Sequence, residues 1–408
     1  MDKKVPLLRF KDFVDDWEQY SYIKKFKLSQ GLQIAIAERY TTFAKNRFFY
    51  ITNEFLKETC EEEWFVENPP TSVICKKEDV LMTRTGNTGI VITDVEGCFH
   101  NNFFKVDFDR ELFDKYYLYY FWQSPEMHKI ILSKAGSSTI PDLSHKSFLS
   151  LTSLFPIKKE QEKIALLCRH VSENINNNFR KISKLKNLKK ALFEKMFPTK
   201  GNESILLRFK GYGSAWQKKT LGKIGTTYTG LSGKTKDDFG HGEARFVTYV
   251  NVFKNPIADV KGVDFVEIDA SQNIVKNGDV LFTTSSETPE EVGMSSVWLG
   301  DTENTYLNSF CFGYRLFSSE KIDPLYLAYL LRSPEIRKEF QFLAQGISRY
   351  NISKTKVMDI VISVPEDYEE QVKIGKLFFN LDKLIELTQK KYEKLESLKK
   401  AMLNKMFV

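Results

Sequence analysis

The sequence predicts an α+β protein made of two tandem copies of one unit, each an α/β domain followed by a long helix. Three observations predict this fold class. The chain aligns with itself at an offset of about 200 residues. Each copy has strand-like segments followed by helix-like ones. Each copy also ends in a long segment without proline, at 159–197 and 369–407, where apolar residues recur with helical spacing.

The internal repeat is the strongest of these observations, because every match occurs in the same order in both copies. Two copies, each large enough for a domain and a helix, are typical of a duplicated protein rather than of a solenoid. Such halves tend to pack about a pseudo-two-fold axis, so we expect two similar but diverged binding faces. The paired segments are LLRFK (7–11 and 206–210), Trp17 and Trp216, RFFYITNEF (47–55) and RFVTYVNVF (245–253), DVLMT (79–83) and DVLFT (279–283), SPE (124–126 and 333–335), KEQEKI (159–164) and EEQVKI (369–374), and LKNLKKALFEKMF (185–197) and LESLKKAMLNKMF (395–407).

The elements of the α/β part follow from residue type and from the residues that interrupt them. β-Branched and aromatic residues bounded by glycine or aspartate predict strands. Proline in a first helical turn predicts a helix start, and Pro156 and Pro365 mark the ends of the two domains. The predicted strands are 79–85, 89–95 and 103–108, and the predicted helices are 112–122, 125–135, 326–332 and 334–344.

The two long helices carry apolar residues at alternating spacings of three and four, which is the seam of a coiled coil. Each helix would be on the order of 50 Å long at 1.5 Å per residue. Neither can bury its apolar stripe alone, so the helix of the other copy is the expected partner. A simple spacer whose lysines only face solvent is the alternative. The predicted seam positions are Ile164, Leu167, Val171, Asn174, Asn178, Lys181, Leu185, Leu188 and Leu192, and Ile374, Leu377, Leu381, Leu384, Thr388, Lys391, Leu395, Leu398 and Met402.

Composition limits the class of protein. With 408 residues, 42% of them apolar, the chain can form two or three domains with real cores. It has no apolar run near the roughly 20 residues of a membrane span, and its start lacks the apolar stretch of a signal peptide. A cytoplasmic location without a membrane partner is therefore expected. Five scattered cysteines without a CxxC pair indicate reduced thiols rather than disulfides or a zinc site.

Basic residues are concentrated in one segment. The net charge of +7 is mild, but Lys and Arg cluster between Arg180 and Lys195. Such a cluster favours a polyanionic partner such as nucleic acid, and a solvated helix face would show the same composition. The cluster alone leaves both interpretations open.

Motifs for catalysis, metal binding or cofactor binding are lacking in the sequence. The five histidines show no metal-ligand spacing, and neither GxSxG nor HExxH occurs. GLSGKT (230–235) resembles a phosphate-binding loop, but Tyr228 stands where that motif needs its first glycine. ENPPT (67–71) resembles a methyltransferase motif, but Thr71 replaces the aromatic residue, and a turn is the simpler interpretation. We therefore expect this chain to bind no cofactor or metal itself.

The polar and basic loops of the two copies are the candidate nucleic-acid contacts. Arg and Asn can form paired hydrogen bonds with guanine and adenine edges, while Ser, Thr and Lys suit phosphates. An ordinary surface loop remains the alternative for any single residue. The candidates are Lys45, Asn46, Arg47, Arg84, Thr85, Asn87, Thr88, Ser137 and Ser138 in the first copy, and Lys234, Lys236, Arg245, Thr284, Ser285, Ser286, Ser348, Arg349, Tyr350 and Asn351 in the second.

This arrangement resembles the specificity subunit of Type I restriction–modification systems over essentially the whole chain. In that family a Trp followed by a strand opens each domain, as Trp17 and Trp216 do here. A proline and a Glu-Gln-x-x-Ile helix start close the domain, and an L-x-x-L-K-K-A segment with a K-M-F ending finishes each helix. Together these motifs are specific, although each alone is weak. The closing residues are Pro156, Glu160, Gln161 and Ile164, and Pro365, Glu370, Gln371 and Ile374.

The resemblance implies a non-catalytic DNA sequence-specificity subunit. Target-recognition domains at 1–157 and 200–366 would each read one half of a bipartite double-stranded DNA site. Spacer helices at 158–199 and 367–408 would pair as an antiparallel coiled coil that sets the gap between the half-sites. The chain would dock two methyltransferase subunits and, through them, two restriction–translocase subunits. Those partners would bind S-adenosylmethionine, ATP and Mg²⁺.

One departure from similarity between the copies concerns a recognition loop. Residues 31–50 are more apolar than their counterparts at 230–249, so we expect the two halves to read different sequences. Two other functions remain open. One is a self-contained DNA-modifying or DNA-cleaving enzyme with duplicated recognition domains, although the repeat leaves little sequence for a catalytic domain. The other is a coiled-coil scaffold without DNA specificity.

Overall fold

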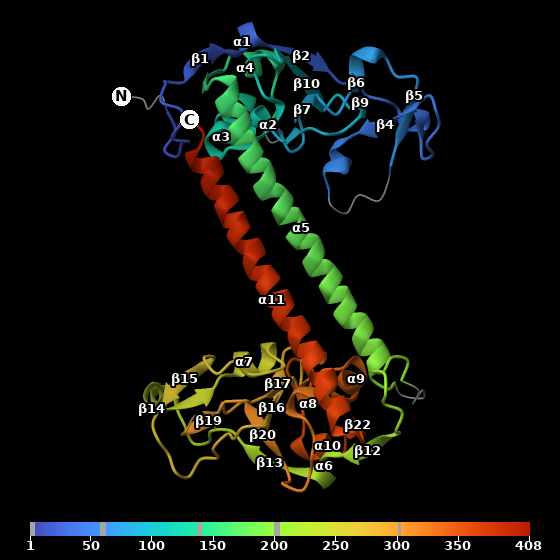
Figure 1. Cartoon of the computed structure of the whole chain (residues 1–408), viewed down its shortest axis with the longest axis vertical. Coiled ribbons are helices and arrows are strands. Elements are labelled where there is room, and N and C mark those ends of the chain that lie inside the picture. The colour runs from blue at the N-terminus through green and yellow to red at the C-terminus, as the bar shows by residue number, and fades with distance from the viewer. Residues whose placement is uncertain (1–4, 58–62, 137–140, 200–204, 301–302) are drawn as a thin grey trace. The chain divides into compact units, whose positions relative to one another are not determined.

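The chain forms two compact units, whose elements are labelled in Figure 1. The first unit comprises Met1–Arg180 and Gln389–Val408, and the second comprises Lys181–Thr388. Each unit therefore contains the α/β domain of one copy together with a part of both long helices. The predicted α+β fold class, with two tandem α/β domains that are each followed by a long helix, is confirmed. The computed structural model describes residues 5–57, 63–136, 141–199, 205–300 and 303–408.

The elements of the first copy are β1 (Glu18–Ser21), α1 (Tyr22–Lys25), β2 (Phe26–Gln30), η1 (Ile36–Glu38), β3 (Arg39–Tyr40), β4 (Arg47–Ile51), η2 (Asn53–Leu56), β5 (Phe65–Glu67), η3 (Thr71–Val73), β6 (Ile74–Cys75), β7 (Val80–Thr83), β8 (Val91–Ile92), β9 (Gly97–Phe99), β10 (Phe103–Phe108), α2 (Lys115–Gln123), α3 (Pro125–Ala135), α4 (His145–Leu149), β11 (Thr152–Phe155) and α5 (Lys158–Met196). An antiparallel sheet of order β2-β10-β7-β8 shares one core with α2, as Phe104 and Trp122 show. A second sheet has the order β3-β5-β4-β9-β6, and β1 pairs with β11.

The elements of the second copy are β12 (Trp216–Thr220), α6 (Leu221–Ile224), β13 (Gly225–Thr229), η4 (Lys236–Asp238), β14 (Phe239–Val247), α7 (Tyr249–Lys254), β15 (Val263–Val266), β16 (Val280–Thr283), β17 (Ser285–Ser286), β18 (Ser295–Val297), β19 (Thr305–Leu307), β20 (Cys311–Leu316), α8 (Pro324–Leu330), α9 (Pro334–Leu343), β21 (Tyr350–Asn351), α10 (Lys354–Met358), β22 (Val361–Pro365) and α11 (Tyr368–Lys405). The sheet of order β13-β20-β16-β18 and the pair β12-β22 correspond to the first copy's β2-β10-β7-β8 and β1-β11. The core sheets of the two copies therefore have the same topology.

Most of the predicted elements are confirmed, and the strand predicted at 103–108 coincides with β10, but the other two predicted strands are shorter than expected. The strand predicted at 79–85 ends at Thr83, because the following residues bond to other loops instead of continuing the ladder. The strand predicted at 89–95 is reduced to β8. The helix predicted at 112–122 begins only at Lys115, because Asp114 accepts a hydrogen bond from the N–H of Tyr117 and so caps α2.

The repeated motifs LLRFK and Glu-Gln-x-x-Ile meet in an ion pair that both units contain. Arg9 donates from Nε and Nη2 to the two carboxylate oxygens of Glu160, at 2.8 Å each. Arg208 and Glu370 repeat the pair at 2.8 and 2.7 Å. Both glutamates are fully buried, so each charge depends on its arginine partner.

The glutamine of the same motif ties the start of each long helix to the preceding domain. The Oε1 of Gln161 accepts from the N–H of Asp114 at 2.9 Å, and its Nε2 donates to the carbonyl of Pro156 at 2.8 Å. Gln371 makes the two equivalent bonds in the second unit, at 2.9 and 2.8 Å. These contacts give the repeated Glu-Gln pair a structural role in positioning the helix.

We expect Arg9→Ala to destabilise the first unit by about 3 kcal/mol, since the change leaves the carboxylate of Glu160 buried without its partner. Chemical denaturation of the purified chain measures this loss. Asp12→Ala is the matched control, because the Lys163–Asp12 pair is 48% and 72% exposed and its removal should leave stability unchanged. If the two variants were equally stable, burial of the Arg9–Glu160 pair would not be the reason that it stabilises the unit.

The long helices α5 and α11 pair in antiparallel orientation. In the first unit the ring of Phe179 on α5 lies 6.3 Å from that of Tyr392 on α11. In the second unit Phe193 on α5 stacks on Phe378 of α11, with a centroid distance of 4.4 Å. Partner numbers fall along α11 as they rise along α5, as the predicted antiparallel pairing requires.

The predicted seam is correct at every seventh residue. At the positions between, the more buried residue lies one position further along each helix, although the predicted Leu167 and Leu377 are half-buried against the cores. Leu384 and Leu398, which were expected in the seam, are 39% and 46% exposed. A pattern of alternating three and four residues can start in either phase, and from Ile374 the spacing runs four then three. The positions with this four-then-three spacing, all of them buried or half-buried, are Ile164, Cys168, Val171, Ile175, Asn178, Ile182, Leu185, Lys189, Leu192 and Met196 on α5, and Ile374, Phe378, Leu381, Ile385, Thr388, Tyr392, Leu395, Lys399, Met402 and Met406 on α11.

The K-M-F ending of each copy packs into the domain of the other copy. Phe407 lies against Tyr117 in the first unit, with ring centroids 5.4 Å apart. Phe197 lies against Tyr326 in the second unit at 5.9 Å. The C-terminal label beside the first-unit elements in Figure 1 marks the same return of the chain. Each core is therefore completed by a helix end that the other copy supplies.

Four of the five cysteines lie in the described residues. Cys75, Cys98, Cys168 and Cys311 are buried free thiols, and Cys60 lies outside the described residues. Burial raises the pKa of the Cys75, Cys98 and Cys168 thiols to about 12. Within the described part of the chain, no helix has both the length and the apolar character needed to cross a membrane.

Candidate nucleic-acid interface

Three segments that are distant in the sequence meet in the first unit. The N–H of Arg84, just after β7, donates to the carbonyl of Asn102 at 2.6 Å, in the turn before β10. The carbonyl of Arg84 accepts from the N–H of Leu143 at 3.0 Å, just before α4. Thr85 Oγ1 also donates to Asn102 Oδ1 at 2.9 Å. The first loop cluster is defined by residues 83–89, 100–102 and 141–143.

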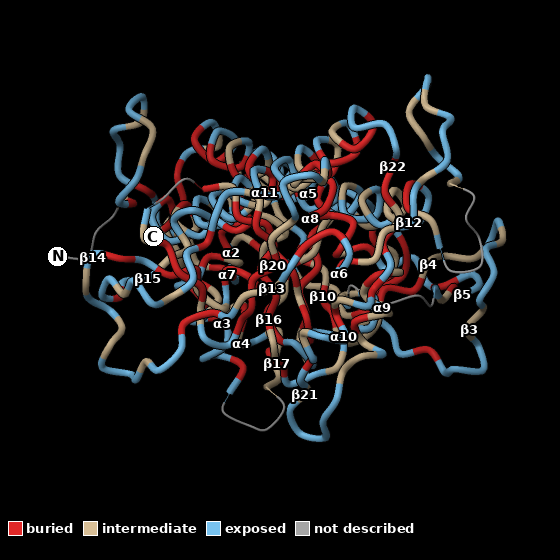
Figure 2. The backbone as a smooth tube through the Cα atoms, turned by 90° about the horizontal axis from the view of Figure 1, so that it is seen from below, coloured by how far each residue is buried: buried red, intermediate tan, exposed pale blue. Residues whose placement is uncertain are grey.

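The second unit builds the same arrangement from the equivalent backbone positions. The N–H of Thr284 donates to the carbonyl of Phe310 at 2.9 Å, and the N–H of Ile352 donates to the carbonyl of Thr284 at 3.0 Å. Strand β17 pairs with β21 beside these bonds. Figure 2 shows β17 and β21 at the edge of this unit that is remote from α11, where much of the chain is exposed. The second loop cluster is defined by residues 283–293, 308–310 and 345–352.

The most polar feature of the first loop cluster is an ion pair. Arg84 donates from Nε and Nη2 to both carboxylate oxygens of Asp142, at 2.6 and 2.8 Å. The hydrogen bonding by Arg84 lowers the pKa of Asp142 below the usual range for aspartate. The two side chains are 34% and 43% exposed, so a ligand can reach them. Thr284 and Asn351 stand at the equivalent positions of the second cluster, and the two clusters therefore offer different chemistry.

Some of the predicted contact residues face inward. Thr88 is 6% exposed, and its Oγ1 donates to two backbone carbonyls at 3.0 and 2.7 Å. Ser285 and Ser286 are 4% and 7% exposed. Asn87 is exposed, with a φ of +63° that forms the tip of its turn. The three buried hydroxyl residues are placed to shape the loops, whereas Asn87 is open to a ligand.

A narrow hairpin forms the outer part of the second loop cluster. Gln345 and Asn351 exchange backbone hydrogen bonds of 2.9 and 2.8 Å. Gly346 has a φ of +144°, and a Cβ there would lie 2.0 Å from a backbone oxygen, so the turn requires glycine. Ser137 and Ser138, from the corresponding region of the first copy, lie outside the described residues. Among the candidates in the hairpin, Ser348, Arg349 and Asn351 are exposed and Tyr350 is half-buried.

The first group of basic candidates lies apart from the first loop cluster. Lys45 and Asn46 occupy an exposed turn, and Arg47 is the first residue of β4. Asn53, beyond the other end of β4, donates to the carbonyl of Gly86 in the cluster at 2.9 Å. Since β4 is five residues long, about 13 Å of strand separates its two ends. The structure therefore does not bring these three candidates together with Arg84.

The basic candidates of the second copy are more varied in position. Lys234 forms an ion pair with Asp269 at 2.9 Å, whereas Lys236 is exposed on η4. Arg245 is exposed near the end of β14. Tyr249, just after that strand, donates its hydroxyl to a backbone carbonyl of the second loop cluster at 2.6 Å. Arg245 thus lies on a strand that leads directly to the cluster.

A half-buried arginine holds the long loop of the second cluster in place. Arg337 on α9 donates to the carbonyls of Gly293, Glu290 and Val292 at 2.8, 2.8 and 2.7 Å. Burial lowers the pKa of Arg337 to about 10. Three bonds from one rigid guanidinium fix the backbone of a loop that has little secondary structure of its own.

Sequence reasoning missed Asn102, Asp142, Phe310 and Arg337 as residues of the two clusters. Asn102 and Phe310 lie in turns whose polar residues, such as Asn101 and Asn308, mark a loop without indicating which other loop it adjoins. The order of the strands, which the structure gives, supplies this information, because β10 lies beside β7 and β20 beside β16. The turn before β10 must then adjoin the loop after β7, and the turn before β20 must adjoin the loop after β16.

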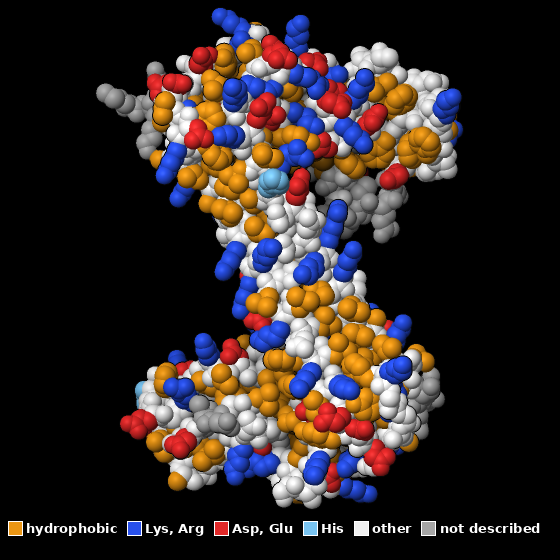
Figure 3. All heavy atoms as spheres, in the orientation of Figure 1, with side chains coloured by type: hydrophobic (Ala, Val, Ile, Leu, Met, Phe, Trp, Pro, Cys, Tyr) orange, Lys and Arg blue, Asp and Glu red, His pale blue; other side chains and the backbone are white. Residues whose placement is uncertain are grey.

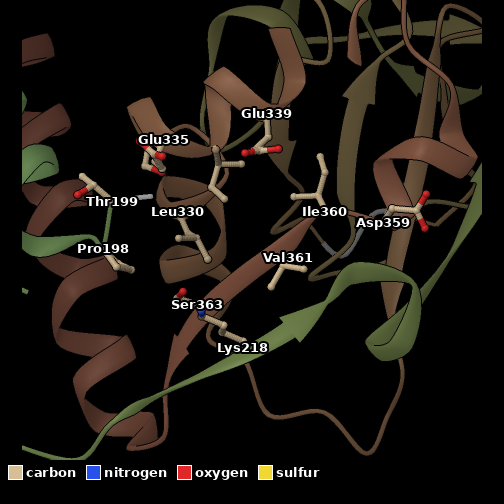
Figure 4. Close-up of a pocket in the computed structure, with 12 residues that line it drawn as sticks. Pro198, Thr199, Lys218, Leu330, Glu335, Glu339, Asp359, Ile360, Val361 and Ser363 are labelled. Carbon is tan, nitrogen blue, oxygen red and sulfur yellow. The ribbon is translucent and has the colours of Figure 1, made fainter. Parts of the chain in front are cut away.

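A cavity of about 460 Å³ in the second unit is lined by residues of α9, β12 and β22 and by the segment after α5 (Figure 4). Glu335, Glu339 and Asp359 line it together with Lys218. This excess of carboxylates disfavours a polyanion, so the cavity is not part of the candidate nucleic-acid interface. Across the described residues, no group of three or more His, Cys, Asp or Glu side chains is placed to hold a metal ion.

We expect Arg84→Ala to weaken binding by about 1–3 kcal/mol for DNA that carries the base read by this side chain. Asp142→Asn is the companion change, because it keeps the shape of the pair and releases the guanidinium. Fluorescence anisotropy of the assembled complex on matched and mismatched duplexes measures both effects. An equal loss on every sequence would assign Arg84 to a phosphate instead of a base.

We expect the same pair to give DNA binding a dependence on pH. Pairing with Arg84 lowers the pKa of Asp142, so the carboxylate stays charged to a lower pH than a free aspartate does, and the pair is lost as the pH falls through this lowered pKa. The wild-type complex at low pH should then bind DNA in the same way as the complex with Asp142→Asn does.

Comparison with known proteins places both copies in one family. The profile of the family described as "Type I restriction modification DNA specificity domain" matches residues 23–187 and 213–397. The chain is 25% identical over 373 residues to the MjaVIII specificity subunit of a Type I restriction enzyme from Methanocaldococcus jannaschii. The aligned region covers 87% of this chain and 84% of that protein. Its fold is similar to that of a Type I restriction–modification S subunit from M. genitalium, with a TM-score of 0.62 and 17% identity over 99% of both chains.

Proposed function

Because this chain belongs to the Type I restriction–modification DNA specificity family, we propose that its two target-recognition domains each read one half of a bipartite DNA sequence. The chain is a specificity subunit and not a catalytic one. The observation that carries the proposal is the presence of two loop clusters built from equivalent backbone bonds and furnished with different side chains. Equivalent frames with different side chains suit two related surfaces that bind different sequences.

The residues of the two clusters support this division. The first cluster presents the half-exposed Arg84–Asp142 pair with the exposed Asn87, which can form hydrogen bonds in the major groove. The second presents Arg349 and Asn351 on its hairpin. We assign the first cluster to one half-site and the second cluster to the other.

The long helices would supply the spacer and the docking surface for the other subunits. Two methyltransferase subunits would bind the chain, and two restriction–translocase subunits would join through them. S-adenosylmethionine, ATP and Mg²⁺ would be held by these partners. Lysines such as Lys184, Lys186 and Lys190 on α5 are exposed, and Figure 3 shows basic side chains standing out along the helices. These charges suit the attraction of DNA toward the complex.

Mapping adenine methylation tests the proposal directly. The chain is expressed with the methyltransferase subunits of its host, and the genome is sequenced for modified adenines. We expect one sequence with two defined halves and a gap of constant length. A single uninterrupted motif would contradict the two-domain assignment, and methylation without any sequence preference would favour a scaffold role. Methylation by the purified chain alone would contradict a non-catalytic role.

A further inference from the structure

One position differs sharply between the two loop clusters. Asn102 and Phe310 occupy equivalent backbone sites, because their carbonyls accept from the N–H groups of Arg84 and Thr284, respectively. The first cluster therefore carries an amide at this point and the second carries an aromatic ring. A change from a hydrogen-bonding to an apolar side chain alters which feature of a base pair can be recognised.

The backbone of Phe310 is held firmly while its ring is left open. Its carbonyl accepts from Thr284 Oγ1 at 2.6 Å as well as from the Thr284 N–H at 2.9 Å. Its own N–H donates to Asn308 Oδ1 at 2.9 Å. The side chain is nevertheless 56% exposed. A single exposed ring is ordinary on a protein surface, but here the ring stands on a rigid turn inside the cluster.

A basic residue lies beside the ring. The guanidinium carbon of Arg349, from the tip of the hairpin, lies 5.8 Å from the centroid of the Phe310 ring. The second cluster thus combines an apolar surface with an adjacent positive charge that can meet a phosphate. This pairing suits a ligand in which a small apolar group lies near a phosphate backbone.

We propose that Phe310 contacts the 5-methyl group of a thymine in the half-site read by the second unit, with Arg349 on a neighbouring phosphate; this inference rests on the proposed function. Phenylalanine has no hydrogen-bonding group, and the thymine methyl is the apolar feature exposed in the major groove. Phe310 is then a specificity-determining residue that selects thymine by the burial of that methyl group. Asn102, at the same place in the first cluster, cannot make this selection.

Replacing thymine with deoxyuridine tests the contact, because it removes only the methyl group. Each thymine of the mapped second half-site is replaced in turn, and binding by the complex of this chain with its methyltransferase subunits is measured. We expect one position at which the wild-type complex binds about fourfold more weakly, the value of one buried methyl group. Phe310→Ala should bind thymine DNA more weakly than wild type and be indifferent to deoxyuridine at that position. Phe310→Leu should restore part of the preference.

Phe342→Ala is the matched control, since this phenylalanine is 85% exposed in the same unit but lies on α9. It should leave both the affinity and the deoxyuridine effect unchanged. If no thymine position is sensitive in the wild type, or if the sensitivity persists in Phe310→Ala, the inference is wrong. An equal loss for Phe310→Ala on thymine and deoxyuridine DNA would point to insertion between base pairs and would also overturn it. Wild-type binding without any sequence preference would instead overturn the proposed function.

Discussion

Exchange of residues 1–157 for the corresponding domain of another specificity subunit should change one half of the methylated sequence and leave the other half unchanged. The physical reason is that every bond that forms the first loop cluster joins residues of this segment, as those of Arg84 to Asn102 and Leu143 do. Cognate sites are commonly bound about 10³–10⁷-fold more tightly than other DNA, so the change of preferred sequence should be close to complete. Sequencing of adenine methylation in cells that carry the chimaera measures it.

The design of this chimaera depends on the end of α11. Met402, Met406 and Phe407 belong to the core of the first unit, so the incoming domain must keep an aromatic residue in the place of Tyr117. Exchange of 200–366 is the reciprocal control and should alter only the other half-site. A simultaneous change of both halves in either chimaera would contradict independent recognition by the two units.

Truncation of the buried phenylalanine at each helix end should strongly destabilise the unit into which it packs. Phe407 is 7% exposed in the first unit and Phe197 is 4% exposed in the second. Removal of a buried phenyl ring leaves a cavity and costs about 3–5 kcal/mol. We therefore expect Phe407→Ala to lower protection from hydrogen exchange mainly in the first unit, and Phe197→Ala mainly in the second. Hydrogen exchange followed by mass spectrometry separates the two effects.

Exposed phenylalanines in the same units provide the controls. Phe43 is 76% exposed in the first unit and Phe342 is 85% exposed in the second, so alanine at either position should leave protection unchanged. If Phe407→Ala lowered protection from hydrogen exchange only in the second unit, the packing of each helix end into the domain of the other copy would be contradicted. Because each core includes a helix end from the other copy, the stability of each domain depends on residues of both copies.

Much of the fold could be predicted from the sequence because its signals are local. The self-alignment of LLRFK and of the K-M-F endings shows the duplication without any structure. Helical spacing, the proline positions and the short strands are likewise properties of neighbouring residues. The phase of the coiled-coil seam was the exception, since apolar Leu384 and Leu398 fit an alternating pattern but lie one residue outside the buried stripe. Burial depends on the partner helix as well as on spacing.

The candidate site was predicted only in part, for a related reason. Arg84, Arg349 and Asn351 were identified from their residue types, yet such types occur in any polar loop. Their partners Asn102, Asp142 and Phe310 were not identified, because these residues become neighbours only when β10 and β20 take their places in the sheets.

The sequence by itself determined that this protein has two similar units with long helices, because periodicity and duplication are written in residue order. Only the tertiary structure decided which loops converge, which hydroxyls turn inward and which core receives each helix end. Those outcomes depend on hydrogen bonds and packing between segments far apart in the chain, and the pattern of any single segment does not contain them.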